Sequence, residues 1–483
     1  MRSISRTLPR TLPVTCSVAF TLTLWLGSKW YFQDWFADPF KYPAKAASLS
    51  VTVLMCWCIL LSTRWRFLEE WFHGLDKVYQ VHKRLGRLAF FIILLHPICL
   101  GLDQLPHLID VLGDMWFVVP EGDTYLWGQN LGVAALLVMS LLVALTLWIK
   151  PPYHLWKRSH EWFGLVLGMV VAHILLVDAD IAAYPLLRLW MYGLLLLALG
   201  AFTYIRFLYR YLGPHFRYRV SRIEKTEDIL ELTFTPVEEK MDFKPSQFVY
   251  LSVERPDISP EPHPYSIACG YNLAARFKLG IKQVGDHTRS LDRLTTGDPV
   301  TVYGPYGRFS EPFLSGERDC LFIGGGIGIT PMISMAASLA AAGTPVELHY
   351  AGRSRGVMAY ADRLGETLGA ALSLHCDDEG DTALNLDALL GALGERHLYI
   401  CGPRGLIDAA RAGAEAAGIP AGRVHVELFD NVSSGASAPA AQGDQPFEVE
   451  VASTGEVFTI PPGRSIIEVL EEGVQVKQPL VGV

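Results

Sequence analysis

Four histidines lie in two apolar stretches of the chain at nearly equal separations. His82 and His96 are fourteen positions apart in HKRLGRLAFFIILLHPICLGL, and His160 and His173 are thirteen apart in HEWFGLVLGMVVAHILLVD. A helix rises about 1.5 Å per residue, so each pair spans roughly 20 Å of a bilayer core that is about 30 Å thick. Each stretch therefore places one imidazole near each face of a membrane.

Imidazole is a common axial ligand of haem iron, so two such helices could hold two six-coordinate haem b groups, one above the other. A single histidine in a membrane helix is more often a satisfied polar group. Ionisable residues at that depth are nevertheless rare, and these four are paired by depth. At about 100° per residue, His160 and His173 lie about 140° apart around an ideal helix. The second stretch therefore needs a local distortion, for which Gly164 and Gly168 are candidate positions.

The bulk composition indicates a membrane protein of about three domains. The chain has 483 residues, of which 51% are hydrophobic, and its net charge of −8 argues against general nucleic-acid binding. Its eight cysteines form no CxxC pair and no zinc-ligand spacing. We therefore expect no disulfide framework.

Apolar spans in the first part of the chain predict a six-helix transmembrane bundle over residues 1–212. They lie at 13–32, 46–63, 83–102, 126–149, 160–177 and 185–205. Lys and Arg gather at the N-terminus and after the second, fourth and sixth spans, whereas Asp and Glu gather in the other connections. Because basic connections stay on the cytoplasmic side, both termini are predicted to lie inside, in a plasma (inner) membrane. His82 and His160 then lie near the inner face, and His96 and His173 near the outer face.

Residues 213–314 change to short runs of alternating Val, Ile, Tyr and Phe with frequent turn signals, which predict an antiparallel β-barrel. Two motifs within it suit a flavin. HPYSIA offers an imidazole, an aromatic ring and a hydroxyl, and GDHTR offers a turn with a hydroxyl and a cation for a pyrophosphate. Each motif alone is weak evidence, but their order and spacing predict FAD binding by His263, Pro264, Tyr265, Ser266, Thr288 and Arg289.

Residues 315–430 are expected to form an α/β Rossmann-like nucleotide domain. CLFIGGGIGITPMISMAASLAAAG reads as a strand, a glycine loop and a helix. The glycines permit close approach of a ligand to the backbone, and the helix N-terminus could hold a pyrophosphate. Thr330 is expected to cap this helix and Pro331 to occupy its first turn. The predicted dinucleotide-binding residues are Gly324, Gly325, Gly326, Gly328, Thr330 and Pro331.

Three later positions bear on the choice and reaction of the nucleotide. Arg353 and Arg355 follow the strand VELHYAG, where cations suit a 2′-phosphate and favour NADPH over NADH; solvated loop charges are the alternative. Cys401 ends the strand HLYIC, and a residue at a strand's carboxyl end faces the ligand crevice of such sheets. A buried small residue is the alternative there. The final strand, VHVELFD, ends with Glu427 and Phe429.

Together these motifs resemble those of the NADPH oxidase and ferric reductase superfamily, over residues 46–430. The resemblance implies that His82 and His160 ligate an inner haem, and that His96 and His173 ligate an outer one. It also implies that HPYS and Thr288 bind FAD, and that Gly324 to Pro331 bind the dinucleotide. The resemblance further implies that Cys401 lies beside the nicotinamide and Phe429 over the flavin ring, and these two are the predicted catalytic residues. FKPSQF is similar to the family's F-x-P-G-Q-F, with Ser246 in the place of a glycine.

The tail consists of a small-residue linker, 431–445, and a partial ferredoxin-like segment, 446–483, read as a hairpin followed by a helix. A plant-type cluster needs C-x4-C-x2-C and a further cysteine, and no cysteine follows Cys401 in this chain. We therefore expect a truncated remnant without an iron–sulfur cluster.

These features predict an enzyme that carries electrons across a membrane. NADPH, or NADH, would reduce FAD from the cytosolic side, and two bis-histidine haems would pass the electrons outward to a small-molecule acceptor. The favoured acceptor is O2, giving superoxide or H2O2. The alternatives are a ferric chelate and a protein partner that receives electrons. A non-redox membrane protein would carry no haem, and the four paired histidines argue against it.

Overall fold

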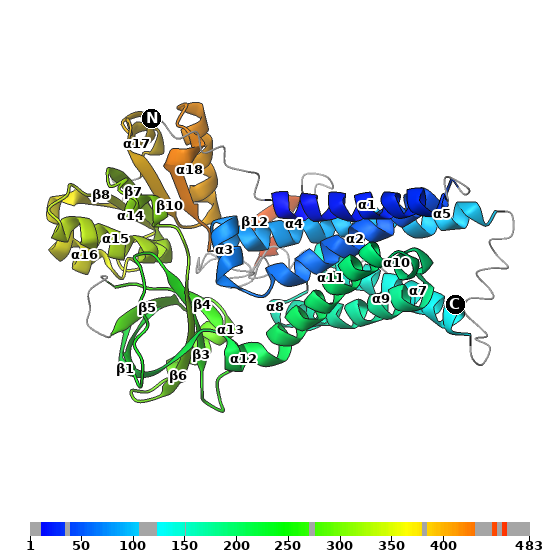
Figure 1. The fold of residues 1–483 in the computed structure, drawn as a ribbon. Coiled ribbons are helices and arrows are strands. Elements are labelled where there is room, and N and C mark those ends of the chain that lie inside the picture. Colours follow the sequence, from blue (N-terminus) through cyan, green and yellow to red (C-terminus); the bar gives the residue numbers. More distant parts are fainter. Residues whose placement is uncertain are drawn as a thin grey trace. The chain divides into compact units, whose positions relative to one another are not determined.

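The computed structural model describes residues 11–33, 39–105, 123–149, 151–269, 276–378, 384–429, 447–451 and 456–460. The chain divides into two compact units, Met1–Ile149 with Ser159–Phe429, and Lys150–Arg158 with Asp430–Val483. The first unit contains most of the helical region and two sheets (Figure 1). In the second, β12 (Phe447–Val451) and β13 (Glu456–Ile460) form an antiparallel hairpin. The linker and the expected helix of the tail lie outside the described residues.

The helical region occupies the chain up to Leu212. Its elements are α1 (Leu12–Phe32), α2 (Lys41–Leu61), α3 (Arg66–Phe72), α4 (Leu75–Ile93), α5 (Leu95–Asp103), α7 (Thr124–Ala144), α8 (Tyr153–Glu161), α9 (Phe163–Val177), α10 (Ala179–Ala183), α11 (Pro185–Thr203) and α12 (Tyr209–Leu212). Two π-helical segments, Leu145–Ile149 and Tyr204–Leu208, continue α7 and α11.

Five helical stretches in the described part of the chain are long and apolar enough to cross a membrane: Lys41–Leu61, Leu75–Asp103, Thr124–Ile149, Leu155–Val177 and Pro185–Leu212. They correspond to the second to sixth predicted spans. The first predicted span, 13–32, forms helix α1 but is not among these five. The sixth continues past its predicted end at 205, because the π-helical segment and α12 extend α11 to Leu212.

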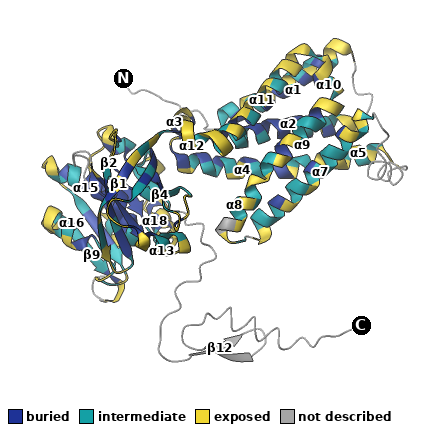
Figure 2. Cartoon of the chain, turned by 90° about the horizontal axis from the view of Figure 1, so that it is seen from below, coloured by how far each residue is buried: buried dark blue, intermediate teal, exposed yellow. Residues whose placement is uncertain are grey.

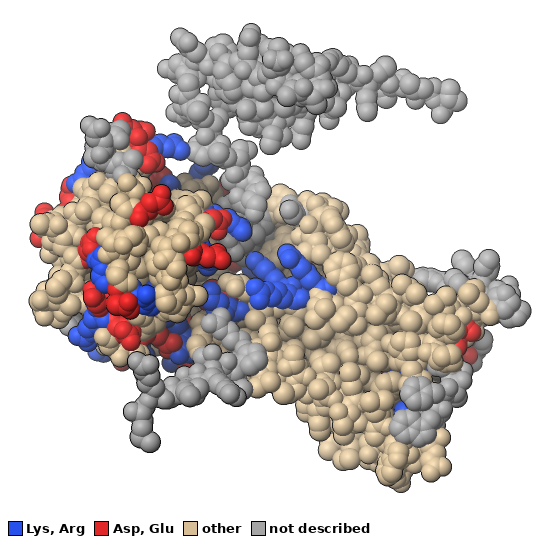
Figure 3. Space-filling model, turned by 90° about the horizontal axis from the view of Figure 1, so that it is seen from above, with Lys and Arg blue, Asp and Glu red and all other residues tan. Residues whose placement is uncertain are grey.

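The surface of the helical region is that of a membrane protein. Large apolar side chains are exposed on it; Leu189 is 76% exposed and Leu196 is 72% exposed. On the face shown in Figure 3, its middle carries few charged side chains, and Lys and Arg gather at one end. An exposed apolar surface of this kind needs lipid to cover it. The chain is therefore an integral membrane protein.

Helix α2 is the central helix of this region. Of its apolar stretch 61% is buried, against 11% for the stretch that contains α7. It packs against α1, α4, α5 and α11, whereas α7 packs against α9. Figure 2 shows the contrast between buried positions on α2 and exposed faces on the surrounding helices. Buried side chains of α2, α9 and α11 share one apolar cluster that includes Leu49, Val53, Leu167 and Met191.

The first sheet is antiparallel and curled. Its strands are β1 (His215–Thr226), β2 (Ile229–Pro236), β3 (Phe248–Val253), β4 (His263–Ser266), β5 (Phe277–Lys282) and β6 (Pro299–Tyr306), in the order β4-β3-β6-β1-β2-β5. A bridge between Ile267 and Leu279 joins the two ends of this order, and the Ala268 amide donates to the Lys278 carbonyl at 2.8 Å. The short helix α13 (Asp286–Ser290) follows β5.

The second sheet is parallel, in the order β11-β10-β7-β8-β9. Its strands are β7 (Cys320–Gly325), β8 (Glu347–Gly352), β9 (Leu372–Cys376), β10 (His397–Cys401) and β11 (Val424–Glu427). The apolar cluster on one face includes residues of α15 (Thr330–Ala341) and α16 (Ala361–Leu368). The cluster on the other face includes residues of α17 (Leu386–Gly391) and α18 (Arg404–Ala416). The strand order reverses between β7 and β10, which is where such sheets bind ligands.

Candidate functional site

The central helix, α2, orients His82 and His96, the two histidines of the first apolar stretch. His82 on α4 donates from Nδ1 to the Cys58 carbonyl at 2.9 Å, and His96 on α5 donates from Nδ1 to the Ala44 carbonyl at 3.0 Å. A carbonyl can only accept, so Nδ1 carries the proton and Nε2 is the nitrogen left to ligate a metal. Ala44 and Cys58 are fourteen positions apart, as are the two histidines, because α2 packs antiparallel to α4 and α5.

Helix α7 orients His173 in the same way. The His173 Nδ1 donates to the Gly128 carbonyl at 2.8 Å. A Cβ added at Gly132 would lie 2.6 Å from that same Nδ1, so only glycine lets α7 approach the ring this closely. Gly128 and Gly132 form a G-x-x-x-G pattern in an apolar span, a known signal of close helix packing that the sequence analysis did not use.

The distortion required between His160 and His173 is present at Trp162, where α8 ends and α9 begins. The Trp162 amide donates to the Ser159 carbonyl and the Leu165 amide to the Trp162 carbonyl, which are three-residue steps that tighten the helix. Gly164 has a different role: a Cβ there would lie 2.0 Å from the Phe202 ring, so this glycine admits a close contact with α11. The other stretch is also interrupted, at Leu94 between α4 and α5.

The structure brings the four histidines together in the predicted pairs. The ring centroids of His82 and His160 are 6.0 Å apart, with the ring planes at 58°. His96 and His173 lie within electrostatic range of each other. All four side chains are half-buried. Paired imidazoles at two depths, with Nδ1 of three of them engaged by backbone carbonyls, fit the ligand set of two bis-histidine haems.

The two flavin motifs also meet in space. Strand β4 holds His263 to Ser266, and the His263 ring stacks on the His287 ring of the GDHTR motif, with centroids 3.7 Å apart. The Thr288 hydroxyl accepts from the Gly285 amide and donates to the Gly285 carbonyl within the start of α13, and its role in FAD binding stays a prediction. Arg289 is exposed beside it.

Strand β4 presents one polar group that a flavin fits. The Tyr265 hydroxyl is buried and has no hydrogen-bond partner among the described residues, and burial raises the pKa of this phenol. A buried donor without a partner is rare in folded proteins and indicates a place for a ligand. Ser266 next to it is buried, and Pro264 on the other side is exposed. The strand therefore fits the flavin site predicted for HPYS.

The glycine loop after β7 serves packing as well as ligand access. A Cβ at Gly328 would lie 2.5 Å from the Cys401 carbonyl oxygen, and one at Gly325 would lie 2.7 Å from the Pro403 ring. Gly324 is similarly close to Ile329, whereas Gly326 has a φ of 55° and no neighbour within 4 Å. The first role of these glycines is to seat the loop against the turn that follows β10, and Gly326 is the position that remains open to a ligand.

Thr330 does not cap the helix as predicted. It is the first residue of α15 and its hydroxyl donates to the Ile327 carbonyl, because a 3₁₀ turn, Gly326–Ile329, precedes the helix and makes Ile329 the capping position. Pro331 lies in the first turn of α15, as expected.

Cys401 lies where the strand order reverses. It is fully buried, between Gly324 of β7 and Glu427 of β11 in the sheet register. Burial raises the pKa of the thiol well above its usual range, and the charge of Glu427 raises it further. Phe429 packs against the apolar cluster that contains Cys401. Both predicted catalytic residues therefore lie at the end of the parallel sheet.

Glu427 is a functional candidate that the sequence analysis passed over. Its Oε2 atom is buried and has no hydrogen-bond partner among the described residues. Burial, followed by the charge of Asp76, raises the pKa of this carboxyl to about 8. The sequence feature that could have identified Glu427 is its position at the end of β11, the strand that pairs with β10 and aligns Glu427 with Cys401.

The two predicted 2′-phosphate ligands differ in the structure. Arg353 is exposed immediately after the carboxyl end of β8. Arg355 donates to Asp362 at 2.6 Å in an ion pair whose carboxylate is 92% exposed. An exposed pair of this kind is weak and leaves the guanidinium able to rearrange.

Several side-chain contacts connect the helices to the antiparallel sheet, and no sequence motif predicted them. The Arg64 guanidinium lies 3.9 Å from the Tyr250 ring centroid and donates to the Tyr79 hydroxyl at 3.1 Å. The buried Glu69 carboxylate accepts from the Gly307 amide at 2.8 Å, and burial raises its pKa despite that bond. These contacts hold the predicted flavin sheet at the end of α4 that bears His82.

Comparisons with known proteins agree with this organisation. The family described as "Ferric reductase like transmembrane component" matches residues 47–171, and the family described as "Oxidoreductase NAD-binding domain" matches residues 322–412. The vanillate O-demethylase oxidoreductase of Pseudomonas putida is 32% identical over 260 residues, which cover 52% of this chain and 79% of that protein.

Two further relatives match the chain in part. The haem-dependent oxidative N-demethylase beta subunit of Ectopseudomonas mendocina is 33% identical over 214 residues, 44% of this chain and 62% of that protein. The chain thus spans less than two thirds of this relative. The solved phthalate dioxygenase reductase, described as a modular structure for electron transfer from pyridine nucleotides to [2Fe-2S], is 27% identical, with a TM-score of 0.41 over 55% of this chain and 82% of that one.

Proposed function

We propose that this chain, which belongs to the NADPH oxidase and ferric reductase superfamily, carries electrons from cytosolic NADPH across the membrane to O2, producing superoxide or H2O2. When bound, FAD accepts a hydride and gives up single electrons, and two haem b groups relay them outward. Residues 1–212 would hold the haems, 213–314 the FAD and 315–430 the nicotinamide nucleotide. Both termini would lie in the cytoplasm.

The observation that carries the proposal is the orientation of the histidines. Nδ1 of His82, His96 and His173 donates to backbone carbonyls of α2 and α7, which leaves Nε2 of each ring as the ligating atom. With Nδ1 engaged in this way, ligation through Nε2 requires no change of tautomer. His82 and His160 would serve the inner iron, and His96 and His173 the outer iron.

The end of the parallel sheet would receive the nicotinamide. Cys401 supplies a neutral, compact side chain there, because burial keeps its thiol protonated. Glu427 places a carboxyl beside it, and an ionised carboxylate would favour the positive charge that a nicotinamide gains as it loses hydride. Phe429 would cover the flavin ring, and the exposed Arg353 would favour the 2′-phosphate of NADPH over NADH.

Two other acceptors have support of their own. The name of the family that matches residues 47–171 points to a ferric chelate. Relatives named as subunits of dioxygenase and demethylase systems point to a protein that receives the electrons. Two histidine ligands would leave no open position on either iron, so any acceptor would be reduced at the edge of the outer haem.

The test is anaerobic reduction of the purified protein by NADPH, followed by admission of O2. We expect low-spin haem bands that reduce with NADPH, and rapid reoxidation by O2 with cytochrome c reduction that superoxide dismutase suppresses. Slow reoxidation by O2 with fast reoxidation by a ferric chelate would overturn the oxidase proposal in favour of a metal reductase. Slow reoxidation of the reduced protein by both O2 and the ferric chelate would favour a protein partner as the electron acceptor.

A further inference from the structure

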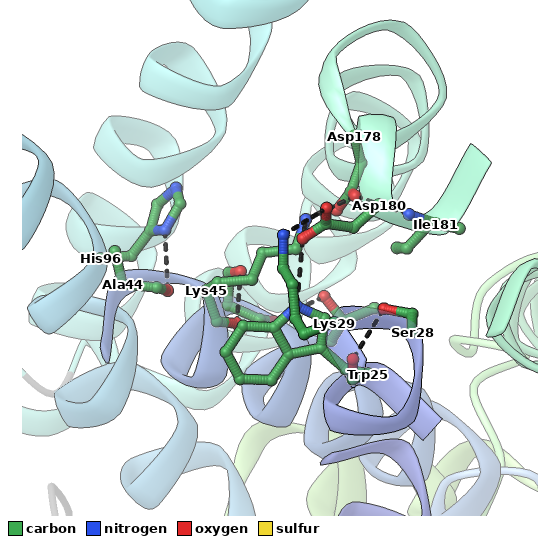
Figure 4. Close-up of polar contacts among 11 residues, drawn as sticks. Trp25, Ser28, Lys29, Ala44, Lys45, His96, Asp178, Asp180 and Ile181 are labelled. Carbon is green, nitrogen blue, oxygen red and sulfur yellow. Dashed lines mark hydrogen bonds and ion pairs between the residues drawn. The ribbon is translucent and has the colours of Figure 1, made fainter. Parts of the chain in front are cut away.

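A network of four partly buried charges links three parts of the helical region at the end that bears His96 (Figure 4). Lys45 of α2 forms an ion pair with Asp178, and its Nζ atom lies 3.9 Å from Asp180. Lys29 of α1 pairs with Asp180 at 3.0 Å, and Trp25 donates from its indole nitrogen to the same carboxylate at 3.0 Å. The two lysines and two aspartates sum to zero charge.

The network adjoins both predicted ligands of the outer haem. Lys45 directly follows Ala44, whose carbonyl accepts a hydrogen bond from the His96 Nδ1 (Figure 4). Asp178 directly follows α9, the helix that contains His173. Lys45 and Asp178 both lie within electrostatic range of the His96 ring. The ion pair therefore connects the backbone that orients one ligand with the helix that carries the other.

The partial burial of these groups strengthens the interactions between their charges. The exposed fractions of the side chains are 13% for Lys29, 19% for Lys45, 12% for Asp178 and 27% for Asp180. Burial alone would raise the pKa of Asp180, but Lys45, Lys29 and Trp25 outweigh it and hold the pKa below its usual range. In surroundings shielded from water, charges interact several times more strongly than in bulk water.

We propose that this network sets the redox potential of the outer haem. This inference rests on the proposed function, since it needs iron bound by His96 and His173. Reduction of an iron centre lowers its positive charge, so a nearby cation favours the reduced form and a nearby anion favours the oxidised form. With Lys29 and Lys45 balanced by Asp178 and Asp180, the network carries no net charge in the wild-type protein. Removing one partner would therefore shift the potential in a direction given by the charge that remains.

The experiment compares Lys45→Met and Asp178→Asn by spectroelectrochemical titration of the purified, haem-loaded protein. We expect the midpoint potential of one haem to fall in Lys45→Met and to rise in Asp178→Asn, with the other haem unchanged. His96→Ala identifies the responding haem as the outer one. Lys41→Met is the matched control, because Lys41 lies on the same helix and pairs with Asp103 at 3.7 Å from a side chain that is 53% exposed.

Opposite signs are the signature of the proposal, because both variants break the same ion pair. Shifts of the same sign, or no shift, would overturn it and assign the network to packing alone. Loss of the outer haem from both variants would assign the network to holding the ligands and would equally overturn the proposal. Lys45→Arg keeps the charge, so we expect the wild-type potential there, and a shifted potential would also contradict the proposal. Absence of haem from the wild-type protein would instead defeat the proposed function.

Discussion

The helical region and the parallel sheet position their predicted site residues by different means. In the helical region, three of the four histidines are oriented by carbonyls of other helices, which lie 24, 52 and 45 positions away along the chain. In the sheet, Cys401 and Glu427 are placed by strand register, and the glycine loop is seated by direct backbone contact. Apolar helices have few side chains that can donate or accept, so the backbone supplies the missing partners. In the parallel sheet, the pairing of neighbouring strands already places the residues at their ends side by side.

The largest effect is expected from replacing the histidines that are predicted to bind haem iron. Changing His96 and His173 to Ala should remove about half of the low-spin haem absorbance, because each haem needs both of its imidazoles. The equivalent pair of changes at His82 and His160 should remove the other half. The measurement is the pyridine haemochrome content per chain, with His73→Asn as the control at an exposed histidine. Full haem content in either double variant would contradict the assignment.

A smaller effect is expected where a helix backbone supports a ligand. Gly132→Ala should place a methyl group against the His173 ring and cost about 1–3 kcal/mol of overpacking. We expect reduced occupancy of the outer haem and an unchanged inner haem, measured by the same haem assay with potentiometric titration. Gly168→Ala on α9 is the matched control, because no atom lies within 4 Å of a Cβ at that position. Equal losses in both variants would indicate general damage to the bundle.

In the sheet, the sharpest test uses pH. The pKa of Glu427 is raised from 4.5 to about 8, so the folded state binds this proton more tightly than the unfolded state. The resulting stabilisation is complete below pH 4.5 and is lost as the pH rises through about 8. We expect Glu427→Gln to remove that pH dependence, measured as the thermal unfolding midpoint from pH 5 to 9.

The same carboxyl should affect the reaction with NADPH. Ionisation above about pH 8 would favour the nicotinamide cation, so the rate of anaerobic flavin reduction should rise roughly tenfold through this range, equivalent to about 1.4 kcal/mol. Glu427→Gln should give a low rate that does not depend on pH in stopped-flow measurements. A rate profile in the variant that matches the wild type would show that the carboxyl has no part in hydride transfer.

The smallest effect concerns the turn that departs from the family pattern. Ser246 has a φ of 62°, a left-handed conformation that glycine adopts without cost, and its buried hydroxyl has no partner among the described residues. Ser246→Gly should therefore stabilise the protein by about 1 kcal/mol. The hydrogen bond that the Ser246 backbone amide donates to the Ser334 hydroxyl does not involve the Ser246 side chain, so it should persist in the variant. A lower unfolding midpoint in the variant would show that the hydroxyl has an undetected partner.

Several features could be predicted from the sequence because they depend on local pattern. The five spans that match were found from apolar length, although the sixth predicted span continues beyond 205 to Leu212. The resemblance to the superfamily is confirmed by the comparisons. The need for a distortion between His160 and His173 followed from residue counting, but its position at Trp162 did not, because three-residue hydrogen bonds leave no mark in the residue types.

By itself, the sequence determined which residues could react: four histidines at two depths, the HPYS strand, the glycine loop and Cys401. Spacing along a helix or strand is set by backbone geometry, so it can be read without a fold. Only the tertiary structure decided how those residues are held. The tautomers of His82, His96 and His173, the ion pair of Lys45 and Asp178, and the raised pKa of Glu427 all arise between segments far apart in the chain. Such contacts depend on how the elements pack, and local spacing does not encode them.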